Sequence, residues 1–368
     1  MTNEPRSPTS APIVRGNGPA ERRLAKRRQA VWRRRAAAAV VVVLIIGYVL
    51  VGWLTAKRQT AHHDSARVGV ARTSRRGRPR SPEHFVVSRL PYTLPSALQD
   101  TAGVSLGSGR VALLGGLNAA DTSTAAVSVL DEHGVKAAAN LPEAQHDAQG
   151  ILLDGRAYVF GGGQFNSYDH ILSFNPDMDS VTEVGSLPTP TSDAAVAALG
   201  GTAYVVGGYN GVQALDTIIT WRPGSHPQLV ARLPSGLRYA AVAASGSRLL
   251  IVGGSHDEAA TTTILSFDPA THNVQHIGDL PSPITHAAAV ALGSYVYILG
   301  GRGSGPGTQS ATILAIDPAT GRSVRVGRLP QPLSDAAAIP LGDRVWLAGG
   351  LSTSGPVDSV LELTLKPL

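Results

Sequence analysis

The sequence contains no cysteine, and only 16% of its 368 residues are charged. The absence of cysteine excludes disulfide bonds, thiolate metal ligands and a cysteine nucleophile throughout the chain. It does not indicate the redox compartment, because a large closed fold can be stable without covalent cross-links. The small charged fraction, together with 41 Gly and 25 Pro, favours short strands joined by tight turns over long amphipathic helices.

Charge is divided unevenly along the chain. Residues 1–83 contain 18 Lys and Arg against 4 Asp and Glu, whereas residues 84–368 contain 14 against 22. The net charge of +6 therefore comes from the N-terminal part. We expect that part to meet anionic lipid or another anionic polymer, and we predict no specific nucleic-acid binding.

Residues 36–54 form an apolar run without a charge, AAAAVVVVLIIGYVLVGWL. At about 1.5 Å per residue, a helix of this length crosses the ~30 Å hydrocarbon layer, and Trp32 and Trp53 stand where interfacial aromatic residues are favoured. Lys and Arg number eight in residues 16–35 and four in residues 55–74, which predicts a cytoplasmic N-terminus. We therefore expect a single-pass protein of the cell membrane whose C-terminal domain is extracytoplasmic.

The apolar run has a polar neighbour on each side. Residues 1–35 are rich in Pro, Ser and Arg without apolar periodicity, which predicts a disordered, basic cytoplasmic tail. Residues 55–83 form a basic linker that could lie along anionic headgroups. A cleaved signal peptide is the alternative to an anchor, but the apolar run is longer than a usual signal core, and no A-x-A site follows it at once.

A glycine doublet recurs six times in the C-terminal part of the chain. The doublets begin at Gly115, Gly161, Gly207, Gly253, Gly300 and Gly349. A Leu-Pro pair keeps the same period, with its leucine at Leu94, Leu141, Leu187, Leu233, Leu280 and Leu329. Two markers that stay in phase over six copies indicate structural repeats.

Each repeat divides into four apolar runs separated by turn residues, as in residues 193–234. An alanine-rich run, a run ending at the doublet, TIITW and QLVARLP predict strands A, B, C and D of an antiparallel meander. Turns such as LGGT between A and B and DPAT between C and D support these boundaries. The first residues of the A strands are small, which we expect where blades converge on a crowded axis.

The repeats resemble Kelch repeats in the doublet, in the aromatic and aliphatic run before it (AYVFGG, YVYILGG), and in the following FDPAT-type turn and Leu-Pro. The resemblance covers residues 84–368. It implies an all-β, six-bladed Kelch-like β-propeller, here preceded by one transmembrane α-helix. Valine replaces the tryptophan that many Kelch repeats carry after the turn, and no arginine follows Leu-Pro. The set is thus divergent and bacterial-like, and sites built on that arginine do not transfer.

The two ends of the repeat region complement each other. The last repeat stops after strand C, SVLELTL, whereas residues 84–91, HFVVSRLP, have the form of an isolated strand D. We expect residues 84–91 to complete the sixth blade and to close the ring, because closure removes the open sheet edges.

A polar position recurs five residues after each Leu-Pro proline, at the start of strand A. Its occupants are Asp100, Asp147, Asp193, Tyr239, His286 and Asp335. We expect them to form a ring on the face that carries the D–A and B–C loops. Such a ring could bind a cation or hydrogen-bond a sugar. We favour a structural role, in which each Asp accepts bonds from loop N–H groups as in an Asx turn.

Recognition is more plausible where the symmetry of the ring breaks. Tyr239 and His286 occupy ring positions at which the other four repeats have Asp. Arg238, His146 and Arg302 are close to ring positions in sequence or lie in equivalent loops. Further polar or aromatic residues of the B–C loops are Tyr168, Asp169, Tyr209, Asn210, His256, Asp257 and Glu258. These residues are candidates for ligand binding, and we predict no metal or other cofactor.

The sequence leaves three functions open. The one we favour is a membrane-tethered binding or scaffold module whose loop face engages a protein or glycan partner at the cell envelope. Since some bacterial Kelch-like propellers, such as sialic-acid mutarotases, act on sugars, the resemblance also implies an alternative, a carbohydrate-active mutarotase or epimerase. We find no H-E-x-x-H zinc motif and no sialidase-type Asp box, so an enzyme is the less favoured hypothesis. A purely structural envelope protein is the third.

Overall fold

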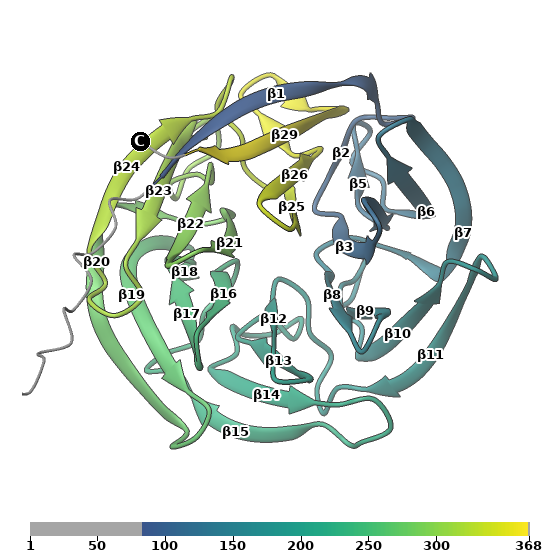
Figure 1. The fold of residues 1–368 in the computed structure, drawn as a ribbon. Coiled ribbons are helices and arrows are strands. Elements are labelled where there is room, and N and C mark those ends of the chain that lie inside the picture. Colours follow the sequence, from purple (N-terminus) through teal and green to yellow (C-terminus); the bar gives the residue numbers. More distant parts are fainter. Residues whose placement is uncertain (1–82, 367–368) are drawn as a thin grey trace, which may run out of the picture. The chain divides into compact units, whose positions relative to one another are not determined.

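The computed structural model describes residues 83–366, and these contain strands and turns but no helix. Six antiparallel sheets surround a central axis (Figure 1); five have four strands, and one has a fifth because the short strand β18 (Ser255–His256) also pairs with β19 (Ala259–Asp268). The all-β, six-bladed propeller predicted from the repeats is therefore confirmed. Within the described range, no helix could cross a membrane. The apolar run 36–54 and the tail 1–35 lie outside the described residues, so the predicted anchor stays a prediction.

We number the blades along the chain and name their strands A to D from the axis outwards. Blade 1 consists of β3 (Ala102–Gly107), β4 (Arg110–Leu114), β6 (Thr124–Asp131) and β7 (Gly134–Gln145). Blade 2 consists of β8 (Gln149–Leu153), β9 (Arg156–Phe160), β10 (His170–Asn175) and β11 (Ser180–Ser186). Blade 3 consists of β12 (Ala195–Leu199), β13 (Thr202–Val206), β14 (Thr217–Trp221) and β15 (Gln228–Arg232).

The remaining blades follow the same order. Blade 4 consists of β16 (Ala241–Ser245), β17 (Arg248–Val252), β19 (Ala259–Asp268) and β20 (Asn273–Ile284). Blade 5 consists of β21 (Ala288–Leu292), β22 (Tyr295–Leu299), β23 (Thr312–Ile316) and β24 (Ser323–Arg328). Blade 6 consists of β25 (Ala337–Leu341), β26 (Arg344–Ala348), β29 (Ser359–Lys366) and β1 (His84–Thr93). Short loop strands are β2 (Leu98–Gln99), β5 (Leu117–Asn118), β18 (Ser255–His256), β27 (Leu351–Ser352) and β28 (Gly355–Pro356).

Blade 6 takes its outer strand from the beginning of the repeat region. β1 pairs antiparallel with β29, starting with His84 opposite Lys366. Phe85 is buried, and its ring meets the ring edge of Tyr297 in blade 5 at 4.9 Å between centroids. β1 runs two residues beyond the predicted segment 84–91. The pairing of β1 with β29 thus closes the ring by joining the two ends of the repeat region within one blade.

Six apolar clusters hold the ring together, one between each pair of neighbouring blades. Every Leu-Pro leucine is buried in one of these clusters, with an exposed fraction of 3–5%. Each blade therefore buries its faces against two neighbours, as expected for repeats that are unstable alone. In blades 1 and 4 the outer strand continues past Leu-Pro to Gln145 and Ile284, where the sequence predicted a loop.

Crowding at the axis explains the small residues of the A strands. A Cβ added at Gly103 would meet Ile339 of the neighbouring A strand closer than 3.0 Å, and one added at Gly150 would meet Val104 equally closely. Neighbouring A strands contact each other around the whole ring. Larger side chains at these positions would therefore push the blades apart.

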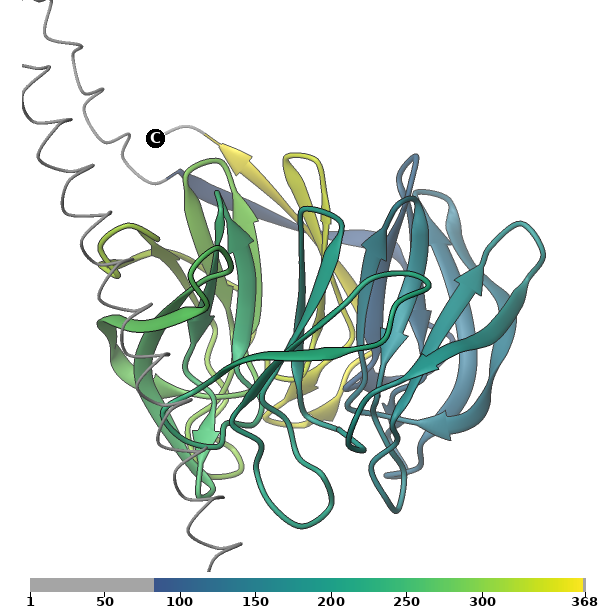
Figure 2. The same ribbon diagram turned by 90° about the horizontal axis from the view of Figure 1, so that it is seen from below.

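The glycine doublets join two loops in every blade. The first glycine has φ between 58° and 67°, and a Cβ there would lie closer than 3.0 Å to a carbonyl oxygen of the loop that leaves the same blade. The second glycine donates its N–H to that same oxygen, at 2.8–2.9 Å. Only glycine combines this conformation with this close approach. The doublets thus fix the D–A loops against the B–C loops on one face (Figure 2).

Candidate functional site

The six predicted ring residues do form a ring, at one mouth of the central channel. Each has a left-handed backbone, with φ between 52° and 59°. Each N–H donates to the carbonyl of the ring residue in the preceding blade, at 2.9–3.2 Å, so six hydrogen bonds close a circle. Asp and His tolerate this conformation better than most residues, whereas a bulky side chain is an outlier there. Tyr239 is therefore held at an energetic cost.

The structural role of the ring differs from the one predicted. We expected each Asp to accept hydrogen bonds from loop N–H groups, but none of the backbone bonds found in the described range ends on these carboxylates. What repeats at this position is a main-chain role: each residue has a left-handed φ and joins the circle of N–H···O=C hydrogen bonds. The side chains are left to line the mouth of the channel.

Four neighbouring blades, 6, 1, 2 and 3, contribute carboxyl groups. Burial raises the pKa of Asp100 and of Asp147 well above the usual range, and repulsion by neighbouring ring carboxylates adds to this shift. Burial also raises the pKa of Asp335, although the Ser334 hydroxyl donates to its carboxylate and opposes the shift. These three carboxyls therefore bind protons more readily than exposed aspartates do.

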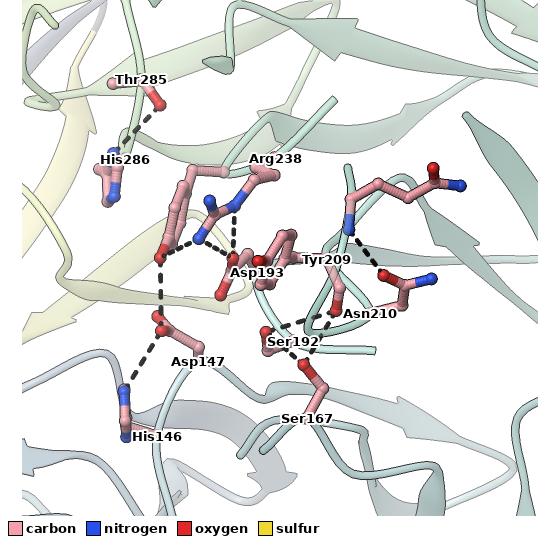
Figure 3. A network of polar contacts seen from close by, with 12 residues as sticks. His146, Asp147, Ser167, Ser192, Asp193, Tyr209, Asn210, Arg238, Thr285 and His286 are labelled. Atoms are coloured by element: carbon pink, nitrogen blue, oxygen red, sulfur yellow. Dashed lines mark hydrogen bonds and ion pairs between the residues drawn. The ribbon is translucent and has the colours of Figure 1, made fainter. Parts of the chain in front are cut away.

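Asp193 differs because a cation pairs with it. Its side chain is buried, and Arg238 Nε donates to its Oδ2 at 2.6 Å (Figure 3). The guanidinium of Arg238 also lies over the ring of Tyr209, 4.2 Å from the centroid, and 5.1 Å from that of Tyr239. The Arg238 side chain is thus fixed by one carboxylate and two aromatic rings from the B–C and D–A loops.

Blades 4 and 5 contribute aromatic rings in place of carboxylates. Tyr239 and His286 stack with 3.6 Å between centroids and 22° between planes. The Tyr239 hydroxyl donates to Asp147 Oδ2 across the channel at 3.5 Å. Burial and the adjacent carboxylates raise the pKa of Tyr239 far above its usual value, so the phenol stays protonated.

The proton of His286 can be placed from its partners. Arg302 Nη2 lies 3.0 Å from His286 Nε2, and because a guanidinium only donates, Nε2 accepts. Nδ1 then carries the proton and donates to Thr285 Oγ1 at 3.0 Å. Burial, with Arg302 and Arg238 nearby, lowers the pKa of His286 to about 2. The imidazole is therefore neutral, and both of its nitrogens are engaged.

His146 extends the polar network at the edge of the mouth. Its Nδ1 lies 2.9 Å from Ser123 Oγ, and its Nε2 lies 3.5 Å from Asp147 Oδ2. Burial lowers the pKa of His146. Behind the ring, a cavity of about 510 Å³ runs between the A strands and is lined largely by alanine, valine and glycine.

The predicted loop residues separate into two groups. Tyr209 and Arg302 reach the mouth, where they contact Arg238 and His286. The other contacts lie within or between loops: the Tyr168 hydroxyl donates to the Ala144 carbonyl of blade 1, and Asn210 Oδ1 accepts from two N–H groups of its own turn. In the part of the chain that the structure describes, no three His, Asp or Glu are placed to hold a metal ion.

Sequence reasoning missed several features of this face. Ser167 and Ser192 bond each other at 3.1 Å, and Ser167 Oγ donates to the Tyr209 carbonyl at 3.0 Å, which joins the loops of blades 2 and 3 (Figure 3). No motif marked these serines. Residues 103–107 have the G-x-S-x-G spacing, but Ser105 lies within β3, so no strand-to-helix nucleophile turn is formed.

Comparison with known proteins agrees with this architecture. A family model described as the KLHDC2/KLHL20/DRC7 Kelch-repeats domain matches residues 104–301, which is more than half of the chain. The chain belongs to the Kelch-repeat family. No curated protein matches the sequence. The solved structure of YjhT is similar to this Kelch propeller, with a TM-score of 0.65 and 19% identity over 76% of this chain and 100% of that one. At this identity the similarity concerns the fold alone, and one fold hosts many functions.

Proposed function

We propose that this Kelch-repeat protein is a membrane-tethered binding module that engages a protein or glycan partner at the cell envelope through the face around the channel mouth. The family is typically built for interaction, and the loops that gather on this face come from all six blades. The tether is the apolar run 36–54, with the tail cytoplasmic and the propeller extracytoplasmic, as the Lys and Arg bias predicts.

One observation carries the proposal. At the mouth the guanidinium of Arg238 is paired with the Asp193 carboxylate, the lowered pKa of His286 leaves its imidazole neutral, and burial raises the pKa values of Asp100, Asp147 and Asp335. A histidine that acts as a general base needs a pKa near the working pH and a free lone pair, and His286 has neither. This mouth offers hydrogen-bond donors, aromatic faces and a fixed guanidinium instead, which suit recognition.

The test uses a variant that keeps the backbone of the ring. Tyr239→Asn retains a residue that tolerates the left-handed conformation but removes the aromatic face and the hydroxyl. The full chain and this variant are compared on a glycan array and by crosslinking to envelope extracts. We expect the variant to lose the captured glycan or protein, while the opposite-face variant Met178→Ser retains it. Equal capture by both variants would overturn binding at the mouth.

An enzyme that acts on sugars is the second candidate, and the cavity behind the mouth favours it. About 510 Å³ is enough for a monosaccharide, and polar groups surround its entrance. The distinguishing measurement is the exchange rate between the anomers of reducing sugars, followed by NMR with the full chain added. Acceleration that disappears in Tyr239→Asn would replace the binding proposal with catalysis.

Tethering is tested separately. Protease added to intact cells should digest the propeller if it is extracytoplasmic. Full protection in cells whose envelope is permeable to the protease would indicate the opposite orientation.

A further inference from the structure

Two large apolar side chains stand in solvent on the mouth face. Phe165 is 91% exposed and Val212 is 84% exposed, and no other large hydrophobic residue in the described range exceeds 74%. Phe165 lies in the B–C loop of blade 2, and Val212 lies in the B–C loop of the neighbouring blade 3. Leaving such groups in water forfeits the free energy that burial against a partner would give.

The loops that carry these tips are held in place. In the blade 3 loop, Asn210 Oδ1 accepts from the N–H groups of Val212 and Gln213 at 2.9 and 2.8 Å. In the blade 2 loop, the Tyr168 N–H donates to the Gly162 carbonyl at 2.7 Å, and Ser167 bonds across to blade 3. The exposed tips are therefore preorganised, and little ordering entropy would be lost when a partner covers them.

Carboxylates without a cationic partner lie near His170, at the end of the loop that carries Phe165. Burial lowers the pKa of His170, and the nearby carboxylates of Glu183, Glu143 and Asp169 oppose that change, which places all three around one imidazole. All three are exposed, and Asp169 belongs to the same loop as Phe165. Among the ion pairs of the described residues, none joins Lys or Arg to these carboxylates.

From this arrangement we infer that the rim formed by blades 1, 2 and 3 docks a protein segment that carries apolar side chains next to Lys or Arg. Phe165 and Val212 supply the apolar anchors, and Glu143, Asp169 and Glu183 supply the complementary charge. Apolar anchors surrounded by polar groups are typical of the residues that dominate protein interfaces. The inference rests on the proposed binding function and narrows it to a protein partner with positive charge.

The test titrates the labelled full chain, solubilised in mild detergent, with four synthetic peptides of equal length. They are apolar and basic, apolar and acidic, apolar and neutral, and polar and basic. The apolar and basic peptide should bind tightest. The variant Phe165→Ser/Val212→Ser should weaken that binding by about tenfold or more, because each anchor loses its buried area. Glu143→Gln/Asp169→Asn/Glu183→Gln should weaken it several-fold and flatten its dependence on salt.

The matched control is Met178→Ser, which removes an apolar side chain, 74% exposed, from the C–D turn on the opposite face and should leave binding unchanged. Three results would overturn the inference: no binding of the apolar and basic peptide, equal binding of the acidic one, or unchanged binding by the double serine variant. If mouth-dependent capture of a glycan or envelope protein persists in any of these cases, the proposed function stands and only the inference fails.

Discussion

The glycine doublets and the mouth ring both recur in all six blades, but only the doublets keep the same residue. At the doublets, a carbonyl oxygen occupies the space that a Cβ would need, so no other residue fits. At the ring, the backbone fixes a left-handed φ, but the side chain faces the channel. Four blades place Asp there, one places Tyr and one places His. Where the main chain alone is constrained, the side chain is free to serve recognition.

Tyr239 is the most informative member of the ring. A ring position filled only for its backbone conformation would favour Asn, Asp or Gly, and four blades follow this preference. Tyr has no local hydrogen bond that favours the left-handed region, yet it stands there and stacks on His286. Strain that persists at one of six equivalent positions indicates a role for that particular side chain.

We expect the largest loss of stability from opening the propeller ring, because the glycine doublets and the mouth ring both depend on its closure. Deleting residues 84–91 removes most of β1, exposes the edge of β29 and uncovers Tyr297 where Phe85 had packed. We expect a loss of at least about 5 kcal/mol in the free energy of unfolding, because loss of Phe85 alone costs about 3–5 kcal/mol. Urea denaturation measures it. An eight-residue deletion within the linker 55–83 is the control, and equal midpoints for the two deletions would contradict ring closure by β1.

A doublet glycine should be far less replaceable than a turn glycine with a similar φ. In Gly161→Ala the new Cβ would clash with the Thr191 carbonyl, whereas in Gly155→Ala nothing lies within 4 Å, although φ is +76°. We expect a loss of about 3–5 kcal/mol for Gly161→Ala and about 1 kcal/mol for Gly155→Ala. Urea midpoints at constant m-value measure both. Similar losses would show that backbone conformation, and not close approach, selects the doublets.

The sequence predicted the features that repeat, since they depend on local spacing. Glycine doublets and Leu-Pro pairs defined six blades, the ring position and the order of strands. It did not predict contacts between loops of different blades, such as Arg238 over Tyr209 or Arg302 at His286, because their geometry depends on how neighbouring blades are rotated. The exposed tips Phe165 and Val212 were missed because no periodic pattern distinguishes an exposed loop residue from a buried one.

Because Arg238 pairs with the buried carboxylate of Asp193, substituting either residue alone should change the stability of the fold. Arg238→Ala leaves a buried carboxylate without its cation, and we expect a loss of about 3 kcal/mol in the free energy of unfolding. In Arg238→Ala/Asp193→Asn, the unpaired charge is gone, and most of the loss should be recovered. A double-mutant cycle measures the coupling. Additive losses would mean that Arg238 acts mainly through its contacts with Tyr209 and Tyr239.

The carboxyl half of the ring should respond to pH with a definite sign. Because the pKa of Asp100 is raised in the folded state, folding favours its protonated form. Its contribution is therefore full below the unfolded pKa, near 4, and is lost as the pH rises through the folded pKa. Asp100→Asn keeps a neutral side chain suited to a left-handed φ. At pH 8 we expect the variant to be more stable than the parent by about 1 kcal/mol, and at pH 3 to have no advantage.

Thermal or urea unfolding at several pH values measures this difference, and Asp154→Asn, which also has a positive φ but lies in the A–B turn of blade 2 away from the ring, is the control. A gain for Asp100→Asn that is the same at pH 3 and pH 8 would mean that Asn suits the left-handed backbone better than Asp does. A gain that appears only as the pH rises would instead show that ionising Asp100, which is buried beside neighbouring ring carboxyls, destabilises the fold. In that case the four carboxyls remain together at a cost in stability, which is the behaviour of side chains retained for the ligand at the mouth.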